Sequence, residues 1–450
     1  MIYTTDAEKE SAMQTTCKIQ LFINKDREGQ YFDLPFQVPE NVSRIDIKYS
    51  YPRHEETMNG TYVEVYEKNI IDLALKNGDD EFIGASGSDR SRIWISEYNS
   101  SLGYAESEIK KGQWSIIIGA YKIEDKGVTV EYEFTFTHKE MVLLKGDLHM
   151  HSLGSDGILS VDEIVSAAKR AGLQYIFITD HNNYFHNNIL RSDADITVMP
   201  GVEWTHFKGH VNMLGIKKPY DGAFYANTLE ETKEKLNSAR EKGAIVSINH
   251  PFCPNCGFKW GLENIEYDTI EIWNGPMKKD NLECLSWWHN ELCKGKKIPV
   301  IGGSDFHRYD IGRGIGMPTT CLYTMSKAPS DISAAIREGC SYITYLTDGP
   351  GVYIECNGKI LGQTAKYVQE LTISFRFTGL HGGDIIKIIT NEGTEEIVCQ
   401  SNVTKATFER LIGNAIFYRT EVHRDYIKGL FCAPVMISNP MYISYDGKSG

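Results

Sequence analysis

The sequence contains no long apolar segment. No run of about 18 apolar residues occurs in its 450 residues, so no transmembrane helix is predicted. The opening residues, MIYTTDAEKESAMQ, contain neither a basic n-region nor an apolar h-region. No signal peptide is therefore visible, and we predict a cytoplasmic location. A chain shortened at its N-terminus would show the same pattern.

Basic residues are not in excess. The sequence has 47 Lys and Arg against 60 Asp and Glu, which gives a net charge of −13. A protein that tracks long nucleic acid usually carries a basic face, so we expect no extended nucleic-acid partner and no membrane partner. An acidic protein can still hold one phosphate group, because bound cations supply local positive charge. We expect a small-molecule ester or phosphoester substrate, and the oligomeric state stays open.

The chain is too long for one ordinary core, so two or three domains are expected. Residues 1–142 are predicted to form an N-terminal β-sandwich, because aromatic and β-branched segments alternate there with Gly, Asn and Asp clusters. Residues 350–450 return to β patterning and predict a small C-terminal β-domain, with a hairpin that turns near residues 391–393. The expected N-terminal strands are residues 17–23, 43–51, 91–98, 114–121 and 128–137.

Between these parts, over residues 143–349, strand-like and helix-like segments alternate, which is typical of parallel β/α units. Four helices are expected, at 161–171, from Asn227 to Gly243, at 280–294 and at 330–339. Ser160 with Glu163, and Asn227 with Glu230, are predicted to cap the first two. The seven expected strands are LLKGDLHMH, YIFITDH, ITVMPGVEW, HVNMLGI, AIVSINH, DTIEIWN and IPVIGGSDFH.

Most of these seven strands end in histidines or carboxylates, and the fourth carries a histidine near its start. The active site of a β/α barrel lies at the C-terminal ends of its strands, so we expect these side chains to converge. A single strand-end histidine is more often a hydrogen-bonded loop residue than a ligand. Nine such groups together would leave a costly polar cluster without partners. We therefore predict that they bind metal: His149, His151, Asp156, His181, Glu203, His210, His250, Asp305 and His307.

The segments DLHMHS, SDG, ITDHN, GVEWT, GHVNMLG, NHP and GGSDFH, within about residues 145–350, together resemble the PHP family, named for polymerase and histidinol phosphatase. The flanking β-domains resemble the CehA/McbA-like branch of these metal-dependent hydrolases. The resemblance implies a distorted seven-stranded (β/α)7 barrel that holds two or three divalent metal ions.

The resemblance also implies a role for each ligand. It gives the first metal His149, His151, a bridging Glu203 and Asp305. It gives the second metal Asp156, His181 and His307, and the third metal Glu203, His210 and His250. Many PHP enzymes have a histidine where this chain has Asp156, so the identity and occupancy of the second metal stay open.

Ligand type indicates the chemistry. Mixed imidazole and carboxylate ligation suits zinc, manganese or iron better than calcium. Adjacent metals can bridge a hydroxide and generate it near neutral pH. We predict a multinuclear-metal-dependent phosphoesterase that hydrolyses a small phosphomonoester or phosphodiester through a metal-bound hydroxide. The alternatives are a metal-dependent carboxyl or carbamate ester hydrolase, and a catalytically silent binding module.

Other polar groups near these motifs could serve substrate or ligands. Asp180 is a candidate for orienting a ligand imidazole, or for passing a proton to the leaving group. Arg308 and Arg313 could grip a phosphate, although a structural or surface role is as well supported. Cys253 and Cys256 form a single Cys-x-x-Cys pair, which can be a zinc half-site or a redox pair. Without a second pair, we interpret it as part of a structured loop over the barrel mouth.

Overall fold

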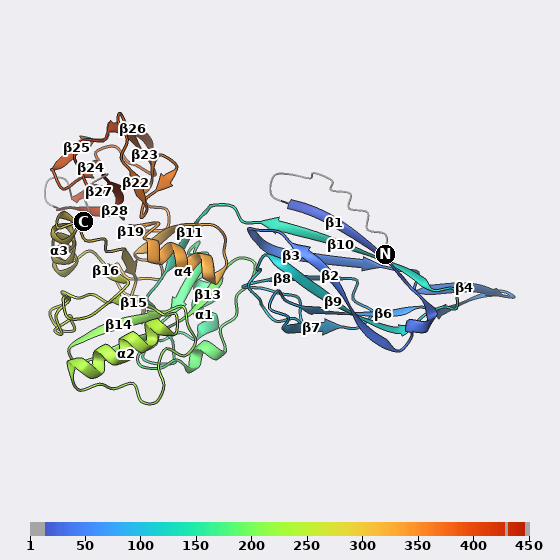
Figure 1. The fold of residues 1–450 in the computed structure, drawn as a ribbon. Coiled ribbons are helices and arrows are strands. Elements are labelled where there is room, and N and C mark those ends of the chain that lie inside the picture. Colours follow the sequence, from blue (N-terminus) through green and yellow to red (C-terminus); the bar gives the residue numbers. More distant parts are fainter. Residues whose placement is uncertain (1–13, 428–430, 446–450) are drawn as a thin grey trace. The chain divides into compact units, whose positions relative to one another are not determined.

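The computed structural model describes residues 14–427 and 431–445 (Figure 1). They divide into two compact units, with the boundary between Met141 and Val142. None of the helices within these described ranges is both long and apolar enough to cross a membrane.

The first unit is the β-rich domain that the sequence predicts (Figure 1). Two four-stranded sheets share one core, and Phe36 of β2 stacks on Phe134 of β10 with ring centroids 4.4 Å apart. Along β10, buried positions alternate with more exposed ones, as in a sheet with one face on the core. In sheet order the strands are β1 (Gln14–Ile23), β10 (Val128–His138), β3 (Val42–Ser50) and β8 (Arg92–Ser96), then β2 (Gln30–Val38), β9 (Gly112–Lys122), β6 (Ile70–Lys76) and β7 (Phe82–Ser86). A 3-10 turn, η1 (Lys25–Arg27), and a hairpin of β4 (His54–Asn59) and β5 (Tyr62–Glu67) complete the unit.

All seven strands expected in the middle of the chain form, and they lie in sequence order within one sheet. They are β11 (Val142–Asp147), β12 (Tyr175–Ile178), β13 (Thr197–His206), β14 (Gly209–Leu214), β15 (Ile245–Ile248), β16 (Thr269–Asn274) and β17 (Val300–Gly303). The expectation that all are parallel is wrong for β14, which is antiparallel to both neighbours. Only Phe207 and Lys208 connect β13 to β14, and a parallel crossover needs a dozen or more residues. The sheet is therefore mixed.

The ladder of this sheet does not close into a barrel within the described residues, so the (β/α)7 barrel stays a prediction. β17 ends the sheet on one side, while β11 continues it on the other by pairing with β18 (Thr319–Thr324). The segments just beyond β11 and β17 nevertheless meet. Met150 and Phe306 form a single parallel bridge, and the Asp305 N–H donates to the His149 carbonyl at 2.8 Å. This contact brings the predicted ligands of residues 149–151 beside those of residues 305–307.

Helices pack on this sheet much as predicted (Figure 1). The capping box of Ser160 and Glu163 is present at α1. The predicted cap of α2 is wrong by one residue: Thr228 is the cap, and its hydroxyl accepts from the Glu231 N–H at 3.2 Å. Trp288 anchors α3, because its fully buried indole donates to the Ile298 carbonyl at 2.9 Å. The helices are α1 (Val161–Arg170), η2 (Phe185–Asn188), α2 (Leu229–Glu241), α3 (Lys279–Cys293) and α4 (Pro329–Glu338).

The sheet runs on into the C-terminal part of the chain. β18 pairs with β19 (Ser341–Thr344), and the path continues through β28 (Phe431–Ser438), β27 (Phe417–Ile427), β24 (Ile385–Ile389) and β25 (Thr394–Val398). β24 and β25 form the predicted hairpin, closed by a bond from the Thr390 N–H to the Gly393 carbonyl. A second sheet holds β21 (Lys359–Ile360), β20 (Gly351–Cys356), β23 (Thr372–Thr378) and β26 (Lys405–Leu411), and β22 (Thr364–Lys366) pairs with β29 (Met441–Ser444). One hydrophobic cluster joins side chains from before and after residue 350, and a separate domain over 350–450 stays a prediction.

Candidate metal centre

The nine predicted ligands come from the C-terminal ends of five strands or their continuations, and from the start of β14. The direction of β14 explains why its histidine stands first. β14 runs antiparallel to β13, and His210 pairs with Thr205, which follows Glu203 by two residues. Its start therefore lies beside the end of β13.

Two of the nine residues have unusual backbones. Asp305 has φ 51° and His250 has φ 28°, in the left-handed region that residues with a Cβ rarely adopt. Such conformations persist when surrounding contacts impose them, and they gather at functional sites. Each residue lies two positions beyond the end of its strand, β15 or β17, where the chain turns.

Glu203 lies at the centre of the cluster and is fully buried. One nitrogen from each of five imidazoles lies within 3.5 Å of its two oxygens. The Asn249 side-chain amide also donates to Oε1 at 2.8 Å. A carboxylate has about four lone-pair sites, too few for six donors. The five histidines are His181 at 2.8 Å, His210 at 3.1 Å, His149 at 3.2 Å, His250 at 3.4 Å and His151 at 3.5 Å.

Asp305 gathers a second set of imidazoles. Its Oδ1 lies 3.1 Å from Nε2 of His151, 3.4 Å from Nε2 of His149 and 3.5 Å from Nδ1 of His307. Burial alone would raise the pKa of Asp305, but the facing His149 and His151 hold it well below the usual range. Glu203 behaves in the same way, since its histidine contacts outweigh burial and hold its pKa well below normal. Both groups are therefore carboxylates that attract cations.

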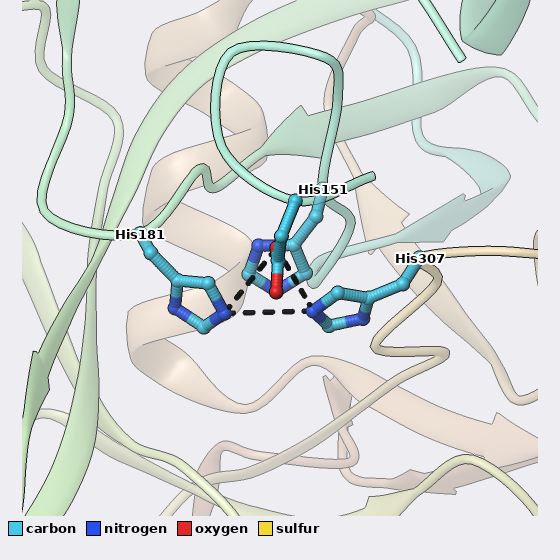
Figure 2. Close-up of side chains that lie close together, drawn as sticks. His151, His181 and His307 are labelled. Atoms are coloured by element: carbon cyan, nitrogen blue, oxygen red, sulfur yellow. Dashed lines mark hydrogen bonds and ion pairs between the residues drawn. The ribbon is translucent and has the colours of Figure 1, made fainter. Parts of the chain in front are cut away.

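The outer end of the cluster is more open. In Figure 2 the rings of His151, His181 and His307 point toward one another. Nε2 of His307 lies 3.4 Å from Nε2 of His181 and 3.2 Å from Oδ1 of Asp156. The Asp156 side chain is 57% exposed. This end could accept a ligand or substrate from solvent.

The structure brings together all nine predicted residues, in four overlapping groups. Within each group, one ligand atom per residue lies within 4.8 Å of the others. The grouping differs in part from the one that the family resemblance implies. His151 joins the outer group, and the proposed first-metal residues fall into two groups. The groups are His151, Asp156, His181 and His307; His149, His151 and Glu203; His149, His250 and Asp305; and Glu203, His210 and His250.

Several buried atoms in this cluster fit a cation. Among the described residues, Nε2 of His149 and Nδ1 of His151 make no hydrogen bond, and Oε2 of Glu203 has only ion-pair contacts, with His181 at 2.8 Å and His151 at 3.5 Å. The 3.2 Å contact between His149 and Glu203 has the distance of an ion pair without hydrogen-bond geometry. A buried polar atom left unpaired costs about 1–3 kcal/mol. Divalent ions between these donors would satisfy them, so the residues present fit such ions.

Glu271 is a buried carboxylate that the sequence analysis overlooked. Its Oε1 lies 2.9 Å from Nδ1 of His149, and its Oε2 accepts from the His250 N–H at 3.0 Å and from the Asn274 side chain at 3.1 Å. The signal was available in the sequence. Glu271 stands inside the apolar strand segment TIEIWN, where an acidic residue is rarely buried without a partner.

Asp147 is a second overlooked carboxylate and ties two ligand-bearing segments together. It accepts from the N–H groups of Ser304 at 3.0 Å, Gly316 at 2.8 Å and His149 at 3.3 Å. Burial raises its pKa to about 6, although these hydrogen bonds act in the opposite direction. It fixes the end of β11 against the end of β17.

Asp180 is fully buried, and its contacts lie along the loop that carries Asp156. It accepts from the Ser152 N–H and hydroxyl, both at 2.6 Å, and from the Ser155 hydroxyl at 2.8 Å. Nδ1 of His186 lies 3.1 Å away on the other side. These partners are not imidazoles of the cluster, so the predicted roles of Asp180 in orienting a ligand or moving a proton stay predictions.

The two predicted arginines differ in exposure. Arg308 is exposed, whereas Arg313 is partly buried. The Arg313 guanidinium lies near Gly275, which directly follows β16. A Cβ placed on Gly275 would be 4.0 Å from Cζ of Arg313. Neither guanidinium has a hydrogen-bonding or ion-pair partner among the described residues. Arg313 therefore lies near the strand end that follows Glu271, with its donors free.

Known proteins resemble parts of this chain. The sequence pattern of the PHP domain family matches residues 147–250. A DNA polymerase/3′-5′ exonuclease PolX from Bacillus subtilis is 44% identical over 64 residues, which are 14% of this chain and 11% of that protein. An uncharacterised protein from Methanocaldococcus jannaschii is 25% identical over 146 residues, which are 29% of this chain and 82% of that protein. The chain thus spans about a tenth of the first relative.

A solved structure is also similar. It is a two-domain protein from Bacteroides vulgatus, described as containing a predicted PHP-like metal-dependent phosphoesterase. The identity is 19% and the TM-score 0.39, and the match covers 62% of this chain and 90% of the other. The family match over 147–250 includes seven of the nine clustered residues, and Asp305 and His307 lie beyond it.

Proposed function

We propose that this chain is a metal-dependent phosphoesterase that hydrolyses a small phosphomonoester or phosphodiester, and that it belongs to the CehA/McbA-like branch of PHP hydrolases. The environment of His149 is the observation that carries the proposal. Oε1 of the Glu271 carboxylate lies 2.9 Å from Nδ1 of His149, where it can accept a hydrogen bond from that nitrogen. Nε2 then faces two further acceptors, Oε1 of Glu203 at 3.2 Å and Oδ1 of Asp305 at 3.4 Å. Three carboxylates around one imidazole create a negative potential that favours binding of a cation.

The same three carboxylates also affect the protonation of the His149 imidazole. Burial alone would lower the pKa of His149, but Glu271, Asp305 and Glu203 raise it well above normal. Without metal, a proton on Nε2 supplies the missing positive charge. With metal, the cation would replace that proton. Two or three divalent ions of manganese, zinc or iron fit the mixed nitrogen and oxygen donors.

The chain's own residues would divide the work as follows. The nine clustered side chains would hold the ions, with Glu203 shared between groups and Glu271 fixing the orientation of His149. Bound ions would supply an activated water and would polarise a phosphoryl oxygen. Arg313, which has free donors, would bind a non-reacting phosphate oxygen. Asp180 would position Asp156 through Ser152 and Ser155.

Hydrolysis assays test the proposal. The purified chain is loaded with manganese or zinc, its metal content is measured, and it is assayed on p-nitrophenyl phosphate and bis(p-nitrophenyl) phosphate. We expect turnover that a chelator abolishes and that added metal restores. Metal-loaded protein without turnover on a broad phosphoester panel would contradict the proposal. Activity on naphthyl acetate or a naphthyl carbamate alone would identify a carboxyl or carbamate ester hydrolase instead.

A further inference from the structure

The loop after β15 carries a compact Cys-Pro-Asn-Cys-Gly turn. The Gly257 N–H donates to the Cys253 carbonyl at 2.9 Å, and the Phe258 N–H donates to the Pro251 carbonyl at 2.8 Å. A Cβ on Gly257 would lie 2.5 Å from the Cys253 carbonyl oxygen, so the turn requires glycine there. The backbone thus holds Cys253 and Cys256 on one side of a tight turn.

Three soft or borderline donors meet at this turn. One donor atom each of His250, Cys253 and Cys256 lies within 4.8 Å of the other two. Sγ of Cys256 is 3.7 Å from Nδ1 of His250. Zinc bonds of about 2.3 Å to sulfur and about 2.0–2.1 Å to nitrogen, at a tetrahedral angle, place such a pair about 3.6 Å apart. The observed separation is therefore already that of two ligands of one ion.

A second observation concerns the sulfur of Cys253. The Cys256 backbone N–H points at this sulfur, with an N–S distance of 3.4 Å. Burial and the Cys256 thiol raise the pKa of Cys253, and this backbone hydrogen bond acts in the opposite direction. Thiolate is the form of cysteine that binds metal.

His250 presents different nitrogens to the two sites. Its Nε2 faces Oε1 of Glu203 at 3.4 Å, and its Nδ1 faces Cys256. The Glu271 carboxylate accepts a hydrogen bond from the backbone N–H of His250 at 3.0 Å and so fixes the start of the loop. The thiol pair is therefore a second group of ligands behind the cluster, joined to it through one imidazole.

We propose that Cys253, Cys256 and Nδ1 of His250 form a further metal site, which takes a thiophilic divalent ion such as zinc. Binding releases the two thiol protons and the Nδ1 proton to solvent. Both thiols are partly exposed, which leaves the fourth tetrahedral position to water. The site does not depend on phosphoesterase activity, because its ligands include sulfur and the nine-residue cluster has none.

Cobalt(II) is the probe for this site. The reduced, metal-free full chain is titrated with cobalt(II), and thiolate-to-cobalt charge-transfer absorption in the near ultraviolet is recorded. We expect the band to appear in the wild type. Cys253→Ser, Cys256→Ser and the double variant should lose it, and the double variant should bind one ion fewer per chain.

Cys293→Ser is the matched control. Sγ of Cys293 lies 3.6 Å from Nε2 of His289, but no third donor joins this pair in the described part of the chain. The control should keep the full band. If the reduced wild type shows no band, or if the double variant keeps it, the proposal is wrong. Loss of the band in Cys293→Ser would likewise contradict it.

A second measurement needs no variant. Iodoacetamide is added to reduced wild type with and without zinc, and modified cysteines are counted by mass spectrometry. Zinc should protect Cys253 and Cys256 and leave exposed Cys293 and Cys432 reactive. Equal modification of all four cysteines with zinc present would overturn the proposal. Failure of phosphoester turnover would leave both readouts unchanged.

Discussion

Oε1 of Glu271 lies 2.9 Å from Nδ1 of His149, on the side of the ring away from Glu203 and Asp305. A carboxylate in this place fixes both the orientation of the imidazole and the nitrogen that carries the proton. Such outer partners of metal-binding histidines tune affinity without touching the ion. Glu271 is therefore a positioning residue.

Glu271→Gln should weaken metal binding, because glutamine lacks the charge that orients and polarises His149. We expect about 10–100-fold lower affinity, measured by competition with a chromogenic chelator. Glu291→Gln is the matched control, since Glu291 on α3 is also buried but pairs with Lys294 and Lys296 just beyond the helix. Equal affinities in wild type and Glu271→Gln would remove Glu271 from the site.

His151→Ala and Asp305→Ala should each abolish turnover and lower the metal content, because these two side chains meet at 3.1 Å within the cluster. Circular dichroism should stay close to that of the wild type. His54→Ala, in the N-terminal unit, should change neither activity nor metal content. Unchanged turnover in either cluster variant would contradict the assignment of these residues to the metal site.

The metal-free protein should be most stable between about pH 4.5 and 6.5. The folded-state pKa values of His149 and His250 are raised well above normal by facing carboxylates and, for His250, by Cys256, against burial. Their stabilising effect is complete below about pH 6.5 and is lost as the pH rises through the raised values. Glu203 and Asp305 have lowered pKa values, so their contribution is present above about pH 4.5 and is lost as the pH falls.

Bound metal should stabilise the protein more strongly as the pH rises, since the ligands must lose protons to bind an ion. The loss of stability at alkaline pH should then disappear. Thermal unfolding midpoints of metal-free and zinc-loaded protein, measured from pH 4 to about pH 9, check both statements. The gap between the two curves should widen as the pH rises. Parallel curves would show that the clustered histidines do not bind the metal.

Arg313→Ala should raise KM for phosphoesters by about 10-fold or more, because a hydrogen bond to a charged group contributes about 1.5–3 kcal/mol. Its effect on kcat should be smaller if the arginine grips a non-reacting oxygen. Arg308→Ala, at an exposed position, serves as the comparison. Steady-state kinetics of both variants test this, and an unchanged KM for Arg313→Ala would exclude it from the substrate site.

Most of the site could be predicted from the motifs at the ends of the strands. The seven strands and the meeting of nine side chains follow from local patterns, because each motif ends a short apolar run. The direction of β14 was missed, although the two-residue connection Phe207–Lys208 already required a hairpin. The position of Glu271 inside an apolar strand segment indicated a buried carboxylate, but its partner, His149, stands 122 residues away and leaves no local signal.

Pairing across long distances explains the other differences. β18 and β19 extend the sheet, and β28 joins it from near the C-terminus. Strand partners so far apart in sequence leave no local trace. The contacts of Asp180 with Ser152 and Ser155 are of the same kind, so the sequence named the residue but not its neighbours.

Anomalous X-ray diffraction from crystals of the manganese-loaded chain tests the central claim most directly. We predict two or three manganese peaks among the nine clustered side chains, with at least one within about 2.0–2.2 Å of an oxygen of Glu203, the range for carboxylate bonds to a small divalent ion. A manganese-loaded crystal with no anomalous peak at Glu203, or with peaks only outside the cluster, would contradict the account.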